Sequence, residues 1–308
     1  MRVKAAVVVT ALVFGMATAS TAHLPEGEVF GAFQWPSNQL PVLDGNISEW
    51  NALPAELWVT SNDFGATQVV GREVDASDFF FRVAVGWNDE LDRIYFVSER
   101  FDDIYDRDGD RDDTYEFGWD TDHTADDFWA TGVASENEAR ERGRGAQSGH
   151  FAWPENLDGE ARGNWFWFWM TQIAAGGSGT NGWSSEEPYA CCDDSFRLEG
   201  SLNGEATLFA EWYVTGFDDY NWEGPEVSVK HDLVEGEIIG IGMSVTDTDE
   251  VDADGNEAFE KFTLGGENLI FGDASFFSDF LLLEVNEAAL ATAVENDSWG
   301  RIKASYGD

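Results

Sequence analysis

The sequence predicts an all-β protein, an antiparallel β-sandwich of two sheets, jelly-roll or immunoglobulin-like, with long loops and few short helices. Apolar and polar residues alternate over strand-length segments, as at residues 79–87 and 94–98. Turn-forming residues separate these segments, and Asn88-Asp89-Glu90 between the two just named indicates a hairpin. Helix-forming composition is confined to residues 134–142 and 287–296. Many strands with few helices favour two packed sheets.

The remaining strands are expected from the same alternation. In residues 79–87, Phe79, Phe81, Val83, Val85 and Trp87 share one face. Further strands are predicted at residues 57–60, 115–119, 165–170, 207–215, 237–246, 259–264, 280–285 and 299–306. The chain shows no internal repeat and no linker of the kind that separates domains.

The N-terminus has the three-part layout of a secretory signal peptide. Arg2 and Lys4 precede an apolar run, and small residues continue to Ala22, so cleavage is expected after Ala19 or Ala22. The apolar run is too short to span a membrane. We therefore predict a signal peptide at residues 1–22, a single domain at residues 23–308, and a secreted protein, extracellular or periplasmic, with no membrane span.

The chain is strongly acidic, with 60 Asp and Glu against 17 Lys and Arg and a formal charge of −43. Such a surface repels nucleic acid and anionic membranes, so neither is expected as a partner. Two explanations stay open: part of the acid binds calcium, and the excess adapts the protein to salty surroundings. Apolar residues make up 43% of the chain, enough for a large core, so the acidity does not indicate disorder.

The two cysteines are adjacent, at Cys191 and Cys192, and form no disulfide framework. Two free thiols and a bond between neighbours both stay open.

Two acidic loops containing glycine follow predicted strands and are candidate calcium sites. Carboxylates spaced around a glycine let a short loop turn several oxygens inward, as a hard cation such as Ca²⁺ requires. The glycine position differs from that of an EF-hand. Solvated acidic turns are the alternative. The predicted ligands are Asp106, Asp108, Asp110 and Asp112 in the first loop and Asp247, Asp249, Asp252 and Asp254 in the second.

An aromatic strand begins at Trp165. Alternation places Trp165, Trp167 and Trp169 on one face and Phe166, Phe168 and Met170 on the other. One face packs on the core; the other is either a flat platform for a ligand or buried beneath a loop. Residues 174–194 are rich in Gly, Ser and acid and are expected to form a long loop.

Several segments, in order, resemble the family 9 carbohydrate-binding modules and their DOMON-like relatives. These are Pro41-Val-Leu-Asp44-Gly45 with Glu49-Trp50, Val85-Gly-Trp87-Asn-Asp, Asp113-Thr-Tyr-Glu116-Phe, Ile239-Gly-Ile-Gly-Met-Ser-Val-Thr-Asp247 and Asp279-Phe-Leu-Leu-Leu283. The resemblance covers most of the mature chain. It implies a β-sandwich that binds calcium structurally and sugar ends in a cleft, usually as a module of secreted glycan-degrading enzymes.

The resemblance also implies roles for individual residues. Glu116 matches a carboxylate and Asn268 an asparagine that hydrogen-bond sugar, and Phe271 stands at one aromatic clamp position. Ser244 replaces a family amide, and Asp110 stands where the second clamp tryptophan is expected. Half of the clamp is therefore absent from its usual place, and the strand carrying Trp165, Trp167 and Trp169 is the candidate replacement. The alternatives are a buried or calcium-bound carboxylate at Glu116, and a turn residue and a core residue at Asn268 and Phe271.

Catalysis is not expected. With 60 acids, a pair of carboxylates spaced as in a glycosidase arises easily by chance, and no nucleophile elbow is present. A copper oxidase would need His23 as the mature N-terminus with a second histidine among His123, His150 and His231. Haem ligation by Met170, Met243 or His150 is supported only by the fact that Met and His are haem-ligand residue types. We predict a calcium-stabilised, non-catalytic protein that binds polysaccharide or oligosaccharide. The alternative is a self-associating extracellular structural or interaction protein that kept the sandwich without the sugar site.

Overall fold

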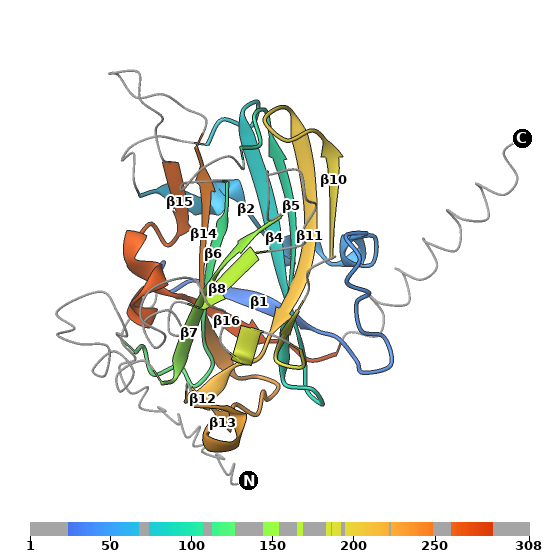
Figure 1. Cartoon of the computed structure of the whole chain (residues 1–308). Helices are drawn as coiled ribbons and strands as arrows, with labels where there is room; N and C mark the ends of the chain where they lie inside the picture. The colour runs from blue at the N-terminus through green and yellow to red at the C-terminus, as the bar shows by residue number, and fades with distance from the viewer. Residues whose placement is uncertain are drawn as a thin grey trace, which may run out of the picture.

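The molecule is built from two facing layers of β-strands (Figure 1). The structure, a computed structural model, describes residues 24–67, 74–106, 113–126, 144–153, 165–168, 183–185, 187–191, 195–221, 223–248 and 260–285. All helices in these ranges are 3-10 helices of three or four residues. The predicted all-β fold class is confirmed.

The first layer, the β4 sheet, has the strand order β10-β11-β5-β4, with β2 on β4 and β9 on β11. All these pairings are antiparallel. Its strands are β2 (Trp58–Thr60), β4 (Phe79–Asn88), β5 (Arg93–Asp102), β9 (Ala190–Cys191), β10 (Phe196–Gly200) and β11 (Ala206–Val214).

The second layer, the β14 sheet, has the order β16-β14-β6-β7-β8, with β15 on β14 and β3 on β15. Its strands are β3 (Phe64–Ala66), β6 (Tyr115–Asp120), β7 (Ala146–Ala152), β8 (Trp165–Phe168), β14 (Ile238–Asp247), β15 (Glu260–Leu264) and β16 (Ser278–Leu282). The short ribbon of β12 (Phe217–Asp219) and β13 (Val229–Lys230) lies apart. The 3-10 helices are η1 (Trp50–Ala52), η2 (Ala55–Leu57), η3 (Ser61–Asp63), η4 (Trp183–Ser185), η5 (Pro225–Val227), η6 (Asn268–Phe271) and η7 (Ala274–Phe276).

Strand β1 (Val29–Gln34) belongs to both layers. Its first residues pair in parallel with β16, from Val29 with Asp279 to Ala32 with Leu282. Its last two residues pair in parallel with β4. The strand thus joins the two layers into one hydrogen-bonded ladder. These parallel pairs are the one departure from the antiparallel arrangement that the sequence predicts.

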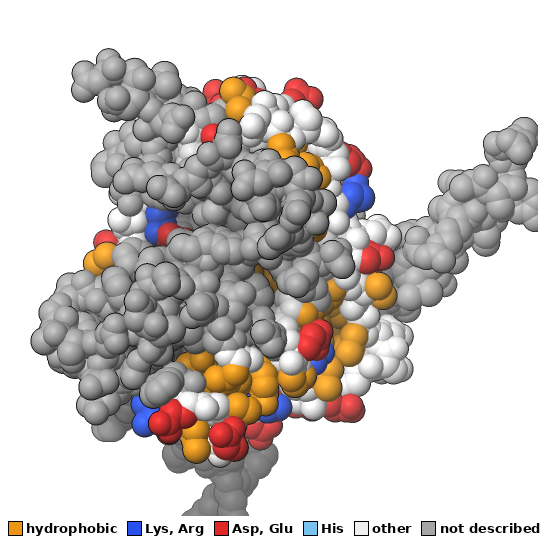
Figure 2. All heavy atoms as spheres, viewed as in Figure 1, with side chains coloured by type: hydrophobic (Ala, Val, Ile, Leu, Met, Phe, Trp, Pro, Cys, Tyr) orange, Lys and Arg blue, Asp and Glu red, His pale blue; other side chains and the backbone are white. Residues whose placement is uncertain are grey.

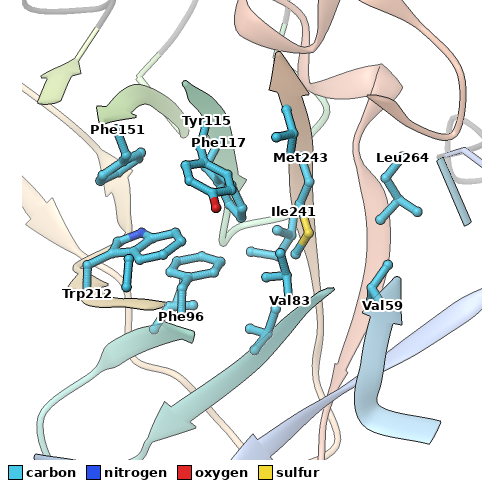
Figure 3. Packing of buried hydrophobic residues seen from close by; sticks show 14 of the residues in the cluster. Val59, Val83, Phe96, Tyr115, Phe117, Phe151, Trp212, Ile241, Met243 and Leu264 are labelled. Carbon is cyan, nitrogen blue, oxygen red and sulfur yellow. The ribbon is translucent and has the colours of Figure 1, made fainter. Parts of the chain in front are cut away.

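The main core lies between the layers (Figure 3). Val83 and Phe96 from the β4 sheet meet Phe117, Ile241 and Met243 from the β14 sheet, and all five are buried. These residues occupy alternate strand positions, as the sequence pattern predicts. Full burial of such side chains contributes about 1.5–3 kcal/mol each. The core therefore fixes which face of each strand points outward.

A second apolar layer covers the outer face of the β4 sheet. Trp35 and Trp50 from the N-terminal segment pack edge to face, with ring centroids 5.0 Å apart. The carboxylate of Glu211 on β11 holds this segment, accepting hydrogen bonds from Trp50 Nε1 at 2.8 Å and from the backbone nitrogen of Gly45 at 2.9 Å. The apolar and Asp-Gly signals around Trp50 thus form a cover for the sheet.

The surface agrees with the composition. On the face in Figure 2, carboxylates stand out along the margins of the coloured surface and few basic groups are visible. Nowhere in the described ranges is a helix long and apolar enough to cross a bilayer. Cys191 is disulfide-bonded, and the sequence has one other cysteine, Cys192, which favours the bonded alternative.

The predicted strands agree with the structure wherever residues are described. One bound differs, because the strand predicted at 280–285 already ends at Leu282. The other exceptions are omissions: β1, β3, β7, β9, β10, β12 and β13 were not expected. The strand predicted at 299–306 and the helical segments predicted at 134–142 and 287–296 lie outside the described residues.

Candidate functional site

The predicted sugar-binding carboxylate lies on the outer face of the β14 sheet. In β6, Tyr115 and Phe117 point into the main core, so Glu116 between them lies on the opposite face. Backbone pairing places Glu116 opposite Ser244 on β14, and Ser244 opposite Thr263 on β15. The two predicted residues Glu116 and Ser244 are therefore direct neighbours, although 128 positions separate them in the sequence.

Glu116 sits in a compact polar cluster, which we call the Glu116 cluster. Its Oε2 accepts hydrogen bonds from Ser244 Oγ at 3.0 Å and from the ammonium of Lys261. Lys261 also donates to the backbone carbonyl of Asn268 at 3.3 Å. The side chains of Glu116 and Lys261 are 10% and 2% exposed. A charge buried this deeply requires a partner, and each of these two residues supplies the other's.

Asn268 begins η6, a turn that lies beside the Glu116 cluster. Farther along the same segment, Phe277 packs on the outer face of the sheet where Gly118 and Gly242 leave room. A Cβ atom at Gly118 would come within 2.2 Å of Phe277 Cζ. The segment from η6 to Phe277 therefore covers part of this face and brings Asn268 close to Glu116. The side chain of Phe271 lies outside the described residues.

The aromatic strand is positioned by its backbone alone. Trp167 on β8 pairs with His150 on β7, and His150 pairs with Glu116. Residue 167 thus stands at the same level of the sheet as Glu116, two strands away. The side chains of Trp165 and Trp167, and all of Trp169, lie outside the described residues. Whether they form an open platform stays a prediction.

A second buried cluster, the Asp113 cluster, occupies the end of the sandwich where the predicted calcium loops begin. Carboxylate oxygens of Asp102, Asp113 and Asp247 lie within 4.8 Å of one another, and all three residues are buried. Arg100, fully buried, contacts Asp102 at 2.5 Å and Asp113 at 2.9 Å. Asp113 also accepts from the backbone nitrogen of Asp106 at 2.6 Å.

This donor set fits a hard cation. The cluster holds three buried carboxylates, and Arg100 contacts two of them, so acidic groups outnumber basic ones in a buried place. Burial raises the pKa of Asp113 to about 8, although Arg100 lowers it. Of the predicted ligands, Asp247 belongs to the Asp113 cluster and Asp106 contacts it. The others, Asp108, Asp110, Asp112, Asp249, Asp252 and Asp254, lie outside the described residues.

The residues named for oxidase or haem alternatives have other surroundings. Met243 is fully buried in the apolar core. His123 Nε2 lies 3.0 Å from Asp279, and His231 lies between Asp218 and Glu237. His23 and Met170, and the side chain of His150, lie outside the described residues.

Sequence reasoning missed three residues of these clusters. Lys261 was missed because a lone lysine in a strand has the pattern of a solvated side chain. Asp102 and Arg100 were missed because they precede the acidic loop and alternate as strand residues do. In a chain with only four lysines, the position of Lys261 among apolar neighbours was the available signal.

Comparison with solved structures shows a similarity of fold. No family model and no curated protein matches the chain. A family 9 carbohydrate-binding module from Caldicellulosiruptor kristjanssonii, solved with cellotriose, has 11% identity and a TM-score of 0.45, with 84% of this chain and 94% of that chain covered. A structure of such a module with glucose has 10% identity and a TM-score of 0.43, covering 84% and 96%.

Proposed function

We propose that the protein binds carbohydrate without catalysis through the outer face of the β14 sheet around Glu116. The observation that carries this proposal is the convergence of Glu116, Ser244 and Asn268. Strands β6, β14 and β15 and the η6 turn bring these residues and Lys261 to one place. Sugar recognition requires a few fixed polar groups beside an apolar surface, and this arrangement supplies the polar part.

In this proposal the residues have distinct tasks. The carboxylate of Glu116 accepts hydrogen bonds from sugar hydroxyls, and the amide of Asn268 orients the ring. Lys261 holds Glu116 and the backbone of the η6 turn in fixed positions, which lowers the entropy lost on binding. Trp165, Trp167 and Trp169 supply the stacking surface, and Phe271 supplies a second aromatic group.

The test is a polysaccharide and oligosaccharide panel with isothermal titration of the best ligand. We expect Glu116→Gln and Trp167→Ala to weaken binding by about tenfold or more, as loss of a charged hydrogen bond or a stacked ring does. Glu226→Gln, at an exposed carboxylate on η5, is the control and should leave affinity unchanged. Equal affinity in the Glu116 variant and the natural chain would contradict the proposal.

One observation favours the alternative of a structural or interaction protein. Oε2 of Glu116 is already engaged by Ser244 and Lys261, and the side chain is 10% exposed. A cluster that serves only to tie strands together would have the same contacts. In that case the natural chain would bind no glycan on the panel and would self-associate in sedimentation analysis.

We also propose that calcium stabilises the fold at the Asp113 cluster. Asp102, Asp113 and Asp247 would supply its oxygens, with the neighbouring acidic loops adding more. A site with Kd near 10⁻⁴–10⁻³ M would add about 1.4–2.7 kcal/mol at 10 mM calcium. Melts in chelator and in calcium at fixed ionic strength should differ, and Asp247→Asn should reduce the difference. Asp232→Asn, at an exposed position, is the control.

We propose in addition that the protein is exported, with residues 1–22 as its signal peptide. N-terminal sequencing of protein recovered outside the producing cells should begin shortly after Ala19 or Ala22. An N-terminus at Met1 in that material would contradict this proposal.

A further inference from the structure

The chain carries a cleft on the side where β1 passes from one layer to the other. The cleft, which we call the β1 cleft, has a volume of about 720 Å³. Its apolar wall includes Phe33 on β1, Leu57 at the end of η2 and Leu283 just after β16. The absence of a side chain at Gly31 lets Leu57 and Leu283 lie over the β1 backbone, since an added Cβ would come within 2.9 Å of either side chain.

The rim of the β1 cleft is acidic. Glu56 and Glu284 line it, both are exposed, and no Lys, Arg or His is among its lining residues. An apolar groove with two carboxylates at its rim suits a segment that combines apolar side chains with positive charge. In a chain with a net charge of −43, most segments are acidic, and the carboxylates of this rim would repel them.

The sequence following the cleft has that combination. The described part of the chain reaches Val285, which is itself a lining residue, and the sequence continues to residue 308. Within that continuation, Trp299-Gly-Arg301-Ile302-Lys303 places two basic residues among large apolar ones, with Tyr306 three residues later. Basic residues are scarce, with 17 in 308 positions, so two within three positions is a distinct local feature.

We propose that the segment Trp299–Tyr306 folds back and binds the β1 cleft of its own chain. Trp299, Ile302 and Tyr306 fill the apolar part, and Arg301 and Lys303 meet Glu56 and Glu284. The 13 residues between Val285 and Trp299 can span up to about 45 Å when extended, so the return is geometrically easy. A connection of only 13 residues also gives an effective concentration on the order of millimolar, which favours binding within one chain.

Zero-length carbodiimide coupling of the full chain tests this proposal, because it joins an amine to a carboxylate only when they touch. The sequence has four lysines, so the products are few. Lys230 lies 2.6 Å from Asp92 and supplies the internal positive control. Mass spectrometry of the digest should show Lys230 joined to Asp92 and Lys303 joined to Glu56 or Glu284.

Matched variants make the outcome decisive. Changing both Trp299 and Ile302 to Ser should lower the Lys303 coupling by about tenfold through loss of apolar contact. Glu226→Gln, away from the cleft, should leave it unchanged. Coupling of Lys303 to no cleft carboxylate, or equally to many carboxylates, while the Lys230 product forms normally, would overturn the proposal. Products joining isotope-labelled to unlabelled chains would overturn it in favour of a second copy as the occupant.

Discussion

Replacing Glu211 by glutamine should change how the stability of the protein depends on pH. Burial, and after it the nearby carboxylate of Glu49, raise the pKa of Glu211 to about 7, although the hydrogen bond from Trp50 opposes this shift. Its ordinary value is 4.5. Between these values the folded chain holds a proton that the unfolded chain has released. Stability therefore falls as pH rises from about 4.5 to about 7.

The magnitude follows from the pKa difference. A shift from 4.5 to about 7 corresponds to at most about 3 kcal/mol between the two ends of this pH range. Glutamine does not titrate, so Glu211→Gln loses this part of the pH dependence. The amide also lowers the stability of the folded variant, because its NH₂ group faces the backbone N–H groups of Asp44 and Gly45, which donate to the carboxylate in the natural chain. We expect it to be less stable at pH 5 and to approach the natural chain by pH 8.

Urea unfolding at several pH values between 4 and 8 measures this difference directly. The general repulsion among the many carboxylates affects both chains alike and cancels in the comparison. Glu226→Gln makes the same chemical change at an exposed position and should give a curve parallel to that of the natural chain. Parallel curves for Glu211→Gln as well would refute the assignment of a buried, protonated anchor on β11.

Three further predictions concern the folded core and are measured by urea unfolding. Gly118→Ala should destabilise the protein by about 1–3 kcal/mol, because the new methyl group meets Phe277 at 2.2 Å; unchanged stability would mean that this ring is free to move. Arg100→Met should cost about 3–5 kcal/mol by leaving two buried carboxylates without their cation. Lys261→Met should cost a similar amount, and adding Glu116→Gln to it should recover most of the loss. Additive effects in that double variant would contradict the ion pair.

The fold could be predicted from the sequence where one face of a strand is apolar and the other polar. Strands β4, β5 and β14 have this pattern, and their inward residues form the core. Strand β1 has no such alternation, because its neighbours lie in both layers and it is covered on different sides along its length. Strand β10 is short, lies at the edge of its sheet and ends with exposed residues, so its pattern is weak as well.

The sequence predicted the acidic and polar residues of the candidate site but not the charged residue that balances them. Residue type and family position indicated Glu116, Ser244 and Asn268, and strand register brings them together. The charge that balances Glu116 depends on which residue of β15 faces outward beside β14, and only the three-dimensional register decides this. The same holds for Asp102 at the end of β5, whose carboxylate lies close to those of Asp113 and Asp247.

The parallel pairing of β1 with β16 has a consequence for how the chain acquires its structure. Val29 pairs with Asp279, a separation of about 250 residues. Contacts so distant along the chain are slow to form, because a long loop must close before any stabilising contact is gained. Until β16 has been synthesised, β1 lacks the partner for its first half, and an unpaired strand is a template for aggregation. The dense negative charge then opposes aggregation, because it makes incomplete chains repel one another until β16 is available to pair with β1.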